Sequence, residues 1–259
     1  MTSTMDGRVA VVTGAGGDIG GACAARLAAS ADVVVCVDLE AARARGTVRD
    51  LTARGGRAVA LTADATGPGF GAAVAEAVRP LGRATAVVHA VAHEEHAPAE
   101  SLGRASVERS LAAGPLAAYG LFTELLVTGC LGPGSALTVI GSLHADRPFA
   151  GCLGYNAAQG ALAQVVRTLA HEWADRGIRV NAVVPGWIRT RGEEVLYDPA
   201  HLDRVAGSLP MGRFGTPADV AGAVAYLSSP EAAYVSGAFL KVDGGLAASL
   251  ARLPGGELP

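Results

Sequence analysis

Residues 11–22 read VVTGAGGDIGGA, a β-branched run that passes through glycines into a helix-forming segment. A glycine-rich turn of this kind lets backbone N–H groups at a helix N-terminus meet the negative charge of a pyrophosphate. Gly14 and Gly20 are expected to permit the tight turn and the close approach of such a ligand. The stretch therefore predicts the first strand and helix of a nucleotide-binding α/β fold.

The rest of the chain continues this alternation of strand and helix. Helical patterns lie near 18–30, 40–54, 68–80, 100–130, 154–176 and 216–229. Between them, seven apolar runs are expected to form strands at 8–14, 32–38, 57–64, 85–92, 136–142, 178–186 and 237–245. The pattern predicts a doubly wound, Rossmann-type α/β fold with a seven-stranded parallel sheet. Without a repeat or linker, residues 1–259 are expected to form one domain, with 253–259 as a loose tail.

Composition argues against several classes of partner. Apolar residues make up 50% of the 259 residues, the formal net charge is -3, and the arginines are scattered, so neither nucleic acid nor a membrane surface is expected as a partner. Apolar runs stay below about 18 residues, which argues against a spanning helix. The N-terminus does not resemble a signal peptide, and the four cysteines lack metal or disulfide spacing, so a reducing cytoplasm is expected.

An acidic residue at the second strand adds to the nucleotide pattern. Asp38 ends that strand, 18 residues after Gly20. A carboxylate there accepts hydrogen bonds from the adenosine ribose hydroxyls and repels a 2′-phosphate. The sequence therefore favours NAD(H) over NADP(H).

At this point the chain resembles the short-chain dehydrogenase/reductase family, over nearly its whole length. The family loop T-G-x-x-x-G-x-G is matched by Thr13, Gly14 and Gly20, with Ile19 as a usual filler. Asp18 takes the place of the middle glycine; aspartate is also a good N-cap residue, whose carboxylate can point away from a phosphate. The resemblance implies further cofactor contacts: Asp64 and Ala65 near the adenine, Thr190 on the nicotinamide carboxamide, and Pro185, Gly186 and Ile188 beside the ring.

The catalytic half departs from the family pattern of Asn, Ser, Tyr and Lys. Ser142 ends the fifth strand and Tyr155 follows 13 residues later, which is the family spacing. Four residues after Tyr155, where the family has its lysine, stands Gln159, and the only lysine in the chain is Lys241. The family's asparagine is also missing, and Gly114 falls at or near its position.

Loss of the lysine changes the acid–base chemistry that the resemblance implies. A free tyrosine has a pKa of about 10, and a neutral amide cannot lower it as a cation does. Tyr155 is therefore expected to act as a neutral phenol, which can protonate a carbonyl but is a poor base for alcohol oxidation. Gln159 can still hydrogen-bond a ribose hydroxyl.

Substitute groups occur in the loop HAVAHEEHAP, residues 89–98. His93 and His96 are expected at the carboxyl end of the sheet, with His144 on the same rim and Cys152 in the pocket wall. These four residues are candidates for the substrate pocket, although loop histidines are commonly just solvated. A His-x-x-His metal site lacks a third ligand at regular spacing, so no metal is predicted.

Three functions remain open from the sequence. The first is an NAD(H)-dependent oxidoreductase, most simply a carbonyl reductase acting on a small molecule. The second is a non-redox enzyme in which Ser142 and Tyr155 polarise an oxygen for elimination, cyclisation or isomerisation. The third is a catalytically silent subunit that pairs with an active homologue. The resemblance also implies dimers or tetramers through helices 100–130 and 154–176, and it makes residues 191–210 a substrate lid.

Overall fold

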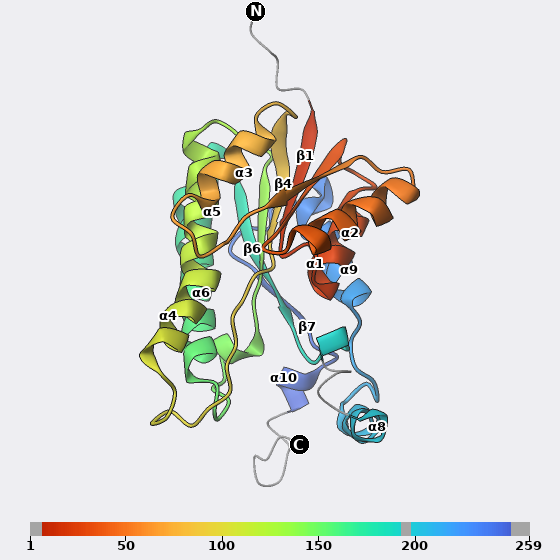
Figure 1. The fold of residues 1–259 in the computed structure, drawn as a ribbon, viewed down its shortest axis with the longest axis vertical. Coiled ribbons are helices and arrows are strands. Elements are labelled where there is room, and N and C mark those ends of the chain that lie inside the picture. Colours follow the sequence, from red (N-terminus) through yellow and green to blue (C-terminus); the bar gives the residue numbers. More distant parts are fainter. Residues whose placement is uncertain (1–6, 193–197, 250–259) are drawn as a thin grey trace, which may run out of the picture.

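The computed structural model describes residues 7–192 and 198–249. Its strands form one parallel sheet in the order β3-β2-β1-β4-β5-β6-β7 (Figure 1). The strands are β1 (Arg8–Thr13), β2 (Val33–Asp38), β3 (Ala58–Thr62), β4 (Arg83–His89), β5 (Ala136–Ile140), β6 (Arg179–Pro185) and β7 (Phe239–Val242). Each of the seven predicted runs contributes one strand, so the predicted fold class is confirmed.

Helices cover both faces of the sheet (Figure 1). On one face lie α1 (Asp18–Leu27), α2 (Ala41–Ala53) and α9 (Pro217–Ser228). On the other lie α3 (Phe70–Val78), α5 (Ala117–Val127) and α6 (Leu153–Glu172), with α4 (Arg104–Leu111) packed on α6. The strands β1, β2, β4, β5 and β6 are buried between two layers, which explains why they are rich in apolar residues along their length, whereas the edge strands β3 and β7 are partly exposed.

The first strand shows how one sequence serves two hydrophobic cores. Val9 and Val11 pack into the core under α3, α5 and α6, whereas Ala10 and Val12 pack into the core under α1 and α9. All four are fully buried. Successive side chains of a strand point to opposite faces, so an uninterrupted apolar run is what a doubly covered strand requires.

The long helix expected over residues 100–130 is interrupted. Between α4 and α5 lies a π-helical turn, η1 (Ala112–Leu116), with Pro115 inside it. Proline lacks an N–H and its ring clashes with the carbonyl four residues earlier. The wider turn accommodates Pro115 without ending the helix.

The lid region contains a helix that the sequence analysis did not predict. α8 (Pro199–Ser208) begins where the Asp198 side chain accepts a hydrogen bond of 2.8 Å from the backbone N–H of His201, with Pro199 in the first turn. An aspartate followed by a proline is a recognisable helix start, so the signal was present in the sequence. A short helix, α10 (Leu246–Ser249), follows β7. The tail predicted for 253–259 lies outside the described residues.

One helical segment has the length and hydropathy of a membrane-spanning helix, although the sequence analysis expected none. Within the described residues, Arg104–Val127 is long and apolar enough to cross a bilayer by length and composition. Half of its most apolar window is buried inside the protein, and the α5 residues Leu121, Phe122 and Leu125 belong to the main core. These contacts give the apolar residues of the segment a role in packing the fold.

Candidate active site

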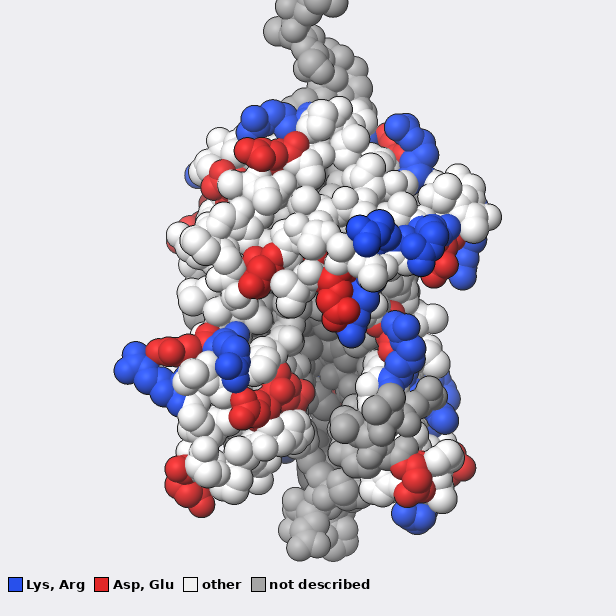
Figure 2. All heavy atoms as spheres, in the orientation of Figure 1, with Lys and Arg blue, Asp and Glu red and all other residues white. Residues whose placement is uncertain are grey.

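A cavity of about 660 Å³ opens at the carboxyl ends of β5 and β6. Its walls come from loops far apart in the chain: the start of α1, the loop after β4, the β5–α6 loop, the segment after β6, and α8. Figure 2 shows the hollow in this face, with acidic and basic side chains interspersed around it. The sheet order reverses between β1 and β4, and open α/β sheets bind ligands at the carboxyl end beside such a reversal.

The glycine-rich loop after β1 has the shape that a pyrophosphate requires. Gly14 has φ +68°, and a Cβ added at Gly20 would lie 2.1 Å from the Gly14 carbonyl oxygen. A Cβ at Gly16 would lie 2.9 Å from Oδ2 of Asp38. A larger residue at any of these three positions would strain the turn or fill the space over the loop. The loop 14–20, which we call the dinucleotide cradle, therefore has room for a pyrophosphate.

Asp38 is held at the end of β2 by backbone donors. Its Oδ2 accepts a hydrogen bond of 2.9 Å from the Gly16 N–H, and its Oδ1 accepts one of 3.0 Å from the Glu40 N–H. Each carboxylate oxygen keeps a second lone pair for a ribose hydroxyl. Further along the same edge, Asp64 is exposed and bonds to Thr66, and Ala65 is half-buried beside it.

Asp18 does not cap α1 as its residue type suggested. The N-cap is Gly17, and Asp18 is the first helical residue. Its carboxylate accepts hydrogen bonds from the backbone N–H of Arg191 at 2.7 Å and from the Arg191 Nε at 2.5 Å. The arginine offsets the negative charge that Asp18 brings to the glycine-rich loop, and it joins that loop to the segment after β6.

Tyr155 and Ser142 line the cavity, and Gln159 hydrogen-bonds Tyr155 from behind the cavity wall. Tyr155 and Gln159 lie one turn apart on α6, and Ser142 follows β5. Burial and the negative charge of Glu94 raise the pKa of Tyr155 to about 12, although hydrogen bonds from Ser142 and Gln159 to its hydroxyl act in the opposite direction. Tyr155 is therefore a neutral phenol at physiological pH, as expected from the missing lysine.

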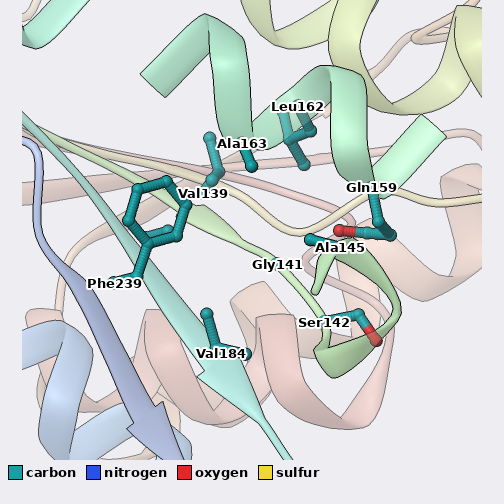
Figure 3. A pocket seen from close by; sticks show the side chains of 10 residues that line it. Val139, Gly141, Ser142, Ala145, Gln159, Leu162, Ala163, Val184 and Phe239 are labelled. Carbon is teal, nitrogen blue, oxygen red and sulfur yellow. The ribbon is translucent and has the colours of Figure 1, made fainter. Parts of the chain in front are cut away.

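Gln159 is only 3% exposed, and its Oε1 has no hydrogen-bond partner among the described residues. The amide N–H₂ is thus the group available to donate to Tyr155. A separate cavity of about 10 Å³ lies beside Gln159, with largely apolar walls that include Leu162 and Phe239 (Figure 3). That space is about the size of one water molecule, so substrate can be held only in the larger cavity.

The predicted nicotinamide contacts gather on one side of the larger cavity. Pro185 ends β6, and Gly186, Ile188 and Thr190 follow it; all four line the cavity together with Ile19 of α1. A Cβ on Gly186 would lie 2.7 Å from Cα of Asp243, so this close approach to the β7 end requires glycine. The cofactor contacts predicted from residues 14–20 and 185–190 therefore come from adjacent loops of the structure.

The four predicted pocket residues divide into two groups. His96, His144 and Cys152 line the cavity, whereas His93 does not: its Nε2 lies 3.4 Å from Nε of Arg109, on the α4 side of the loop. His93 is therefore not a pocket residue, because its loop turns the ring toward α4. Burial lowers the pKa of His144 despite its hydrogen bond to Asn156, and burial together with Glu94 raises the pKa of the Cys152 thiol.

Sequence reasoning missed the structural role of His89, the first residue of the HAVAHEEHAP stretch. The ring is fully buried at the end of β4; Nε2 donates to the Ala113 carbonyl at 3.0 Å, and Nδ1 lies 3.0 Å from the Thr13 hydroxyl. Burial lowers the pKa of His89 to about 4. The neutral ring links β1, β4 and the π-helical turn beneath the site.

Known proteins are similar in sequence to this chain along most of its length. Residues 14–247 match the family described as enoyl-(acyl carrier protein) reductase. Galactitol 2-dehydrogenase (L-tagatose-forming) of Cereibacter sphaeroides is 35% identical over 93% of this chain and 95% of its own. The short-chain reductase protein NovJ of Streptomyces niveus is 34% identical over 92% of this chain and 93% of its own.

Solved structures share the fold. A putative NAD(P)-dependent gluconate 5-dehydrogenase from Beutenbergia cavernae, with bound NADP at low occupancy, is 32% identical with a TM-score of 0.84, covering 95% of this chain and 99% of its own. A short-chain dehydrogenase/reductase from Serratia marcescens is 29% identical with a TM-score of 0.86, covering 95% and 100%. With the family match over residues 14–247 and the full-length relatives, this chain belongs to the short-chain dehydrogenase/reductase family.

Proposed function

We propose that this protein is an NAD(H)-dependent reductase of a carbonyl group on a small molecule, with Tyr155 as a neutral proton donor. The observation that carries the proposal is that Ser142 and Tyr155 meet in the cavity wall, with Gln159 hydrogen-bonded to Tyr155 behind them and the pKa of Tyr155 raised to about 12. Dehydrogenase and reductase activities among the full-length relatives agree with it.

The protonation state of Tyr155 favours reduction over oxidation. Bound NADH would supply the hydride. The Ser142 and Tyr155 hydroxyls would hold the substrate oxygen, and Tyr155 would give it a proton as an alkoxide develops, because an alkoxide is more basic than a phenolate. The reverse reaction needs the phenolate, which with a pKa of about 12 is about one molecule in 10⁵ at pH 7.

Asp38 supports the choice of NAD(H), although solved relatives have been crystallised with NADP. A 2′-phosphate at the adenosine ribose would meet the Asp38 carboxylate. The neighbouring Arg43, which could offset the phosphate charge, pairs with Glu40 at 3.1 Å. Like charges in contact disfavour binding. NADH is therefore the expected cofactor, and Asp38 is the residue expected to select it over NADPH.

The test is calorimetric titration of the purified protein with NADH and NADPH at fixed ionic strength. Micromolar binding of NADH and weaker binding of NADPH are expected. Asp38→Ser should shift the ratio of the two affinities toward NADPH by about tenfold, or about 1.4 kcal/mol. Asp50→Ser, which removes an exposed carboxylate from α2 and has no predicted contact with the cofactor, is the matched control. Equal shifts in both variants would contradict the role given to Asp38.

Oxidation of NADH in the presence of small ketones and aldehydes then tests hydride transfer. The purified chain should consume NADH with one or more of them, and Tyr155→Phe should lose most of this activity while still binding NADH. Binding of NADH without turnover of any carbonyl would contradict the proposed reaction and favour the silent-subunit alternative.

A second candidate is a non-redox reaction, and the neutral state of Tyr155 favours it. A phenol that keeps its proton can polarise a substrate oxygen for elimination, cyclisation or isomerisation without hydride transfer. Conversion of a substrate with no change in NADH absorbance, lost in Tyr155→Phe, would identify this case.

We also propose that the chain forms a homodimer or homotetramer through the α4–α5 and α6 helices, in the cytoplasm. Leu116, Tyr119 and Val127 are 62%, 53% and 76% exposed along one stretch of η1 and α5, and exposed apolar residues of this size commonly mark an interface. A hetero-oligomer with an active homologue is the alternative. Light scattering of the purified protein should give a mass of two or four chains, and a single-chain mass would contradict self-association.

A further inference from the structure

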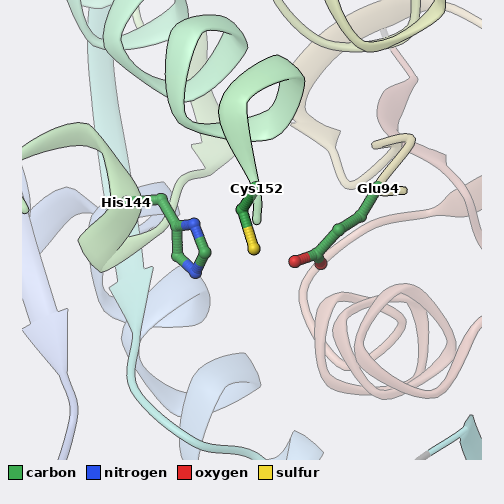
Figure 4. Close-up of side chains that lie close together, drawn as sticks. All are labelled: Glu94, His144 and Cys152. Atoms are coloured by element: carbon green, nitrogen blue, oxygen red, sulfur yellow. The ribbon is translucent and has the colours of Figure 1, made fainter. Parts of the chain in front are cut away.

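Three side chains with metal-binding atoms converge in the cavity, and the proposed hydride chemistry uses none of them. Glu94 lies in the loop after β4, His144 in the short turn η2 (Leu143–Ala145), and Cys152 at the N-cap of α6. Their donor atoms lie within 4.8 Å of one another. Figure 4 shows the thiol of Cys152 between the imidazole of His144 and the carboxylate of Glu94.

We propose that Glu94, His144 and Cys152 form a binding site for a divalent cation of the zinc type. A carboxylate, an imidazole and a thiolate are all zinc ligands, and thiolate argues against Mg²⁺ or Ca²⁺. Three protein ligands with one open position is also the arrangement of catalytic zinc sites, in which the fourth position takes water or substrate. All three residues line the substrate cavity, so the open position faces it.

The spacing is close to what a tetrahedral ion requires. Bonds of about 2.0–2.3 Å place tetrahedral ligands about 3.3–3.8 Å apart. The observed separations of up to 4.8 Å therefore need to close by about 1 Å. Glu94 can make this adjustment, because its side chain extends from an exposed loop and pairs there, at 3.0 Å, with His96, which is itself exposed and can move with it, whereas Cys152 is buried at the start of a helix.

His144 is already oriented as a metal ligand. Its Nδ1 lies 2.7 Å from Oδ1 of Asn156, and the Asn156 amide is fixed because its Nδ2 donates to the Phe149 carbonyl at 2.9 Å. Since an amide oxygen only accepts, Nδ1 carries the proton and Nε2 keeps the lone pair. The ring also stacks on Phe149, with centroids 4.2 Å apart. A histidine whose other nitrogen donates to an oxygen is the usual outer support of a metal site.

The position of the site gives the cation a role. The rings of His144 and Tyr155 are in edge contact, with centroids 4.8 Å apart. An ion held by His144 would place positive charge near the oxygen that Tyr155 protonates and would polarise a substrate carbonyl as a Lewis acid. This role rests on the proposed reductase function; the binding of the ion does not.

The test measures metal binding without cofactor. Purified protein, reduced and freed of metal by a chelator, is titrated with Co²⁺ and then with Zn²⁺. One Co²⁺ per chain is expected, with the near-ultraviolet charge-transfer absorption of a thiolate–cobalt bond, and Zn²⁺ should displace it. Cys152→Ser should abolish the absorption, and Glu94→Gln and His144→Gln should each weaken Zn²⁺ binding by at least tenfold.

Matched controls come from the same loop. Glu95→Gln and His93→Gln remove the same side-chain types, but these residues face Arg109 instead of the cavity, so both should leave Co²⁺ binding unchanged. Glu94→Gln alters an exposed side chain, which keeps the test valid if Cys152→Ser does not fold. Absence of Co²⁺ and Zn²⁺ binding at 1:1 stoichiometry, or charge-transfer absorption that survives in Cys152→Ser, would overturn the proposal. Failure of NADH binding would affect only the proposed reductase.

Discussion

Gln159 stands where the family resemblance leads us to expect a lysine, and we propose that this neutral side chain limits the chemistry available to Tyr155. The amide fills the position one turn along α6 but brings no charge, and its buried Oε1 has no hydrogen-bond partner in the described part of the chain. A nicotinamide ribose hydroxyl would satisfy this oxygen. We therefore expect Gln159 to bind the cofactor without lowering the pKa of Tyr155, which burial and Glu94 raise to about 12.

Restoring the lysine is the direct test of that account. Gln159→Lys should lower the pKa of Tyr155 by a few units and increase alcohol oxidation at neutral pH by at least tenfold, because more phenolate is present. In the original protein, oxidation should keep rising with pH up to about 12, whereas in the variant it should level off earlier. Steady-state rates of NAD⁺ reduction against pH measure both.

Gly114 offers a second step in the same experiment. A Cβ added at buried Gly114 meets no atom within 4 Å, so the backbone leaves room for a side chain to start there. The double variant Gly114→Asn/Gln159→Lys should oxidise alcohols at least as fast as Gln159→Lys alone. No gain in either variant, with NADH binding intact, would argue that the site does not support hydride transfer and would favour the non-redox function.

His89 makes the stability of the fold depend on pH. Its pKa is about 4 in the folded protein and about 6.5 when unfolded, so the unfolded state takes up a proton more readily. The stabilising contribution is full above pH 6.5 and is lost as pH falls through 4. Denaturant unfolding should show a loss of about 3 kcal/mol over this interval that is absent in His89→Gln. The exposed His171→Gln is the control, and an identical pH dependence in His89→Gln would refute the assignment.

At the scale of elements, the strands could be predicted from the sequence, whereas the π-helical turn η1 and the helix α8 were missed. Seven apolar runs locate the strands because a strand covered on both faces must be apolar along its whole length. The π-helical turn around Pro115 was missed because apolar periodicity does not distinguish a wider turn from an α-helical one. α8 was missed because its segment was assigned to a variable lid, although Asp198-Pro199 marks a helix start.

The start of α9 gives a prediction for a single element. Thr216 and Asp219 form a reciprocal cap: the Thr216 Oγ1 accepts from the Asp219 N–H at 3.2 Å, and the Asp219 carboxylate accepts from the Thr216 N–H at 2.8 Å. Thr216→Ala should lower the free energy of unfolding by about 1 kcal/mol, because an N–H at the helix start loses its acceptor. Chemical denaturation measures the change.

The matched control for the cap is Thr52→Ala, which removes an exposed threonine from the last turn of α2. Its hydroxyl donates to the Val48 carbonyl within the helix and caps nothing, so stability should change little. Arg213 and the cap lower the pKa of Asp219 to about 2, so the cap should hold through neutral pH and weaken only below about pH 4. Equal losses in the two threonine variants at neutral pH would contradict the capping role.

At the scale of the whole molecule, the cavity is built from contacts that no local pattern records. Motif spacing located Ser142 and Tyr155 on one side and Gly14, Asp38 and Thr190 on the other. It could not show that Asp18 meets Arg191, 173 positions away, or that Glu94, His144 and Cys152 converge. Such pairs depend on how loops from separate strands approach one another at one edge of the sheet.

The pair between Asp18 and Arg191 yields the last prediction, since it spans the mouth of the dinucleotide cradle. Without Arg191, the Asp18 carboxylate would stand uncompensated beside the N-terminus of α1, where it would repel a pyrophosphate. Arg191→Ala should therefore weaken NADH binding by about tenfold at low ionic strength and by less at high salt. Asp18→Gly/Arg191→Ala should recover most of the loss, because the repelling charge is gone.

Calorimetric NADH titrations of the single and double variants measure this coupling. The control Arg204→Ala removes an exposed positive charge from α8 and should leave binding unchanged. A double variant that binds as weakly as Arg191→Ala would mean that the arginine contacts the cofactor itself instead of neutralising Asp18. Recovery in the double variant would instead show that this chain tolerates an acid in its glycine-rich loop because an arginine from the far side of the cleft compensates for it.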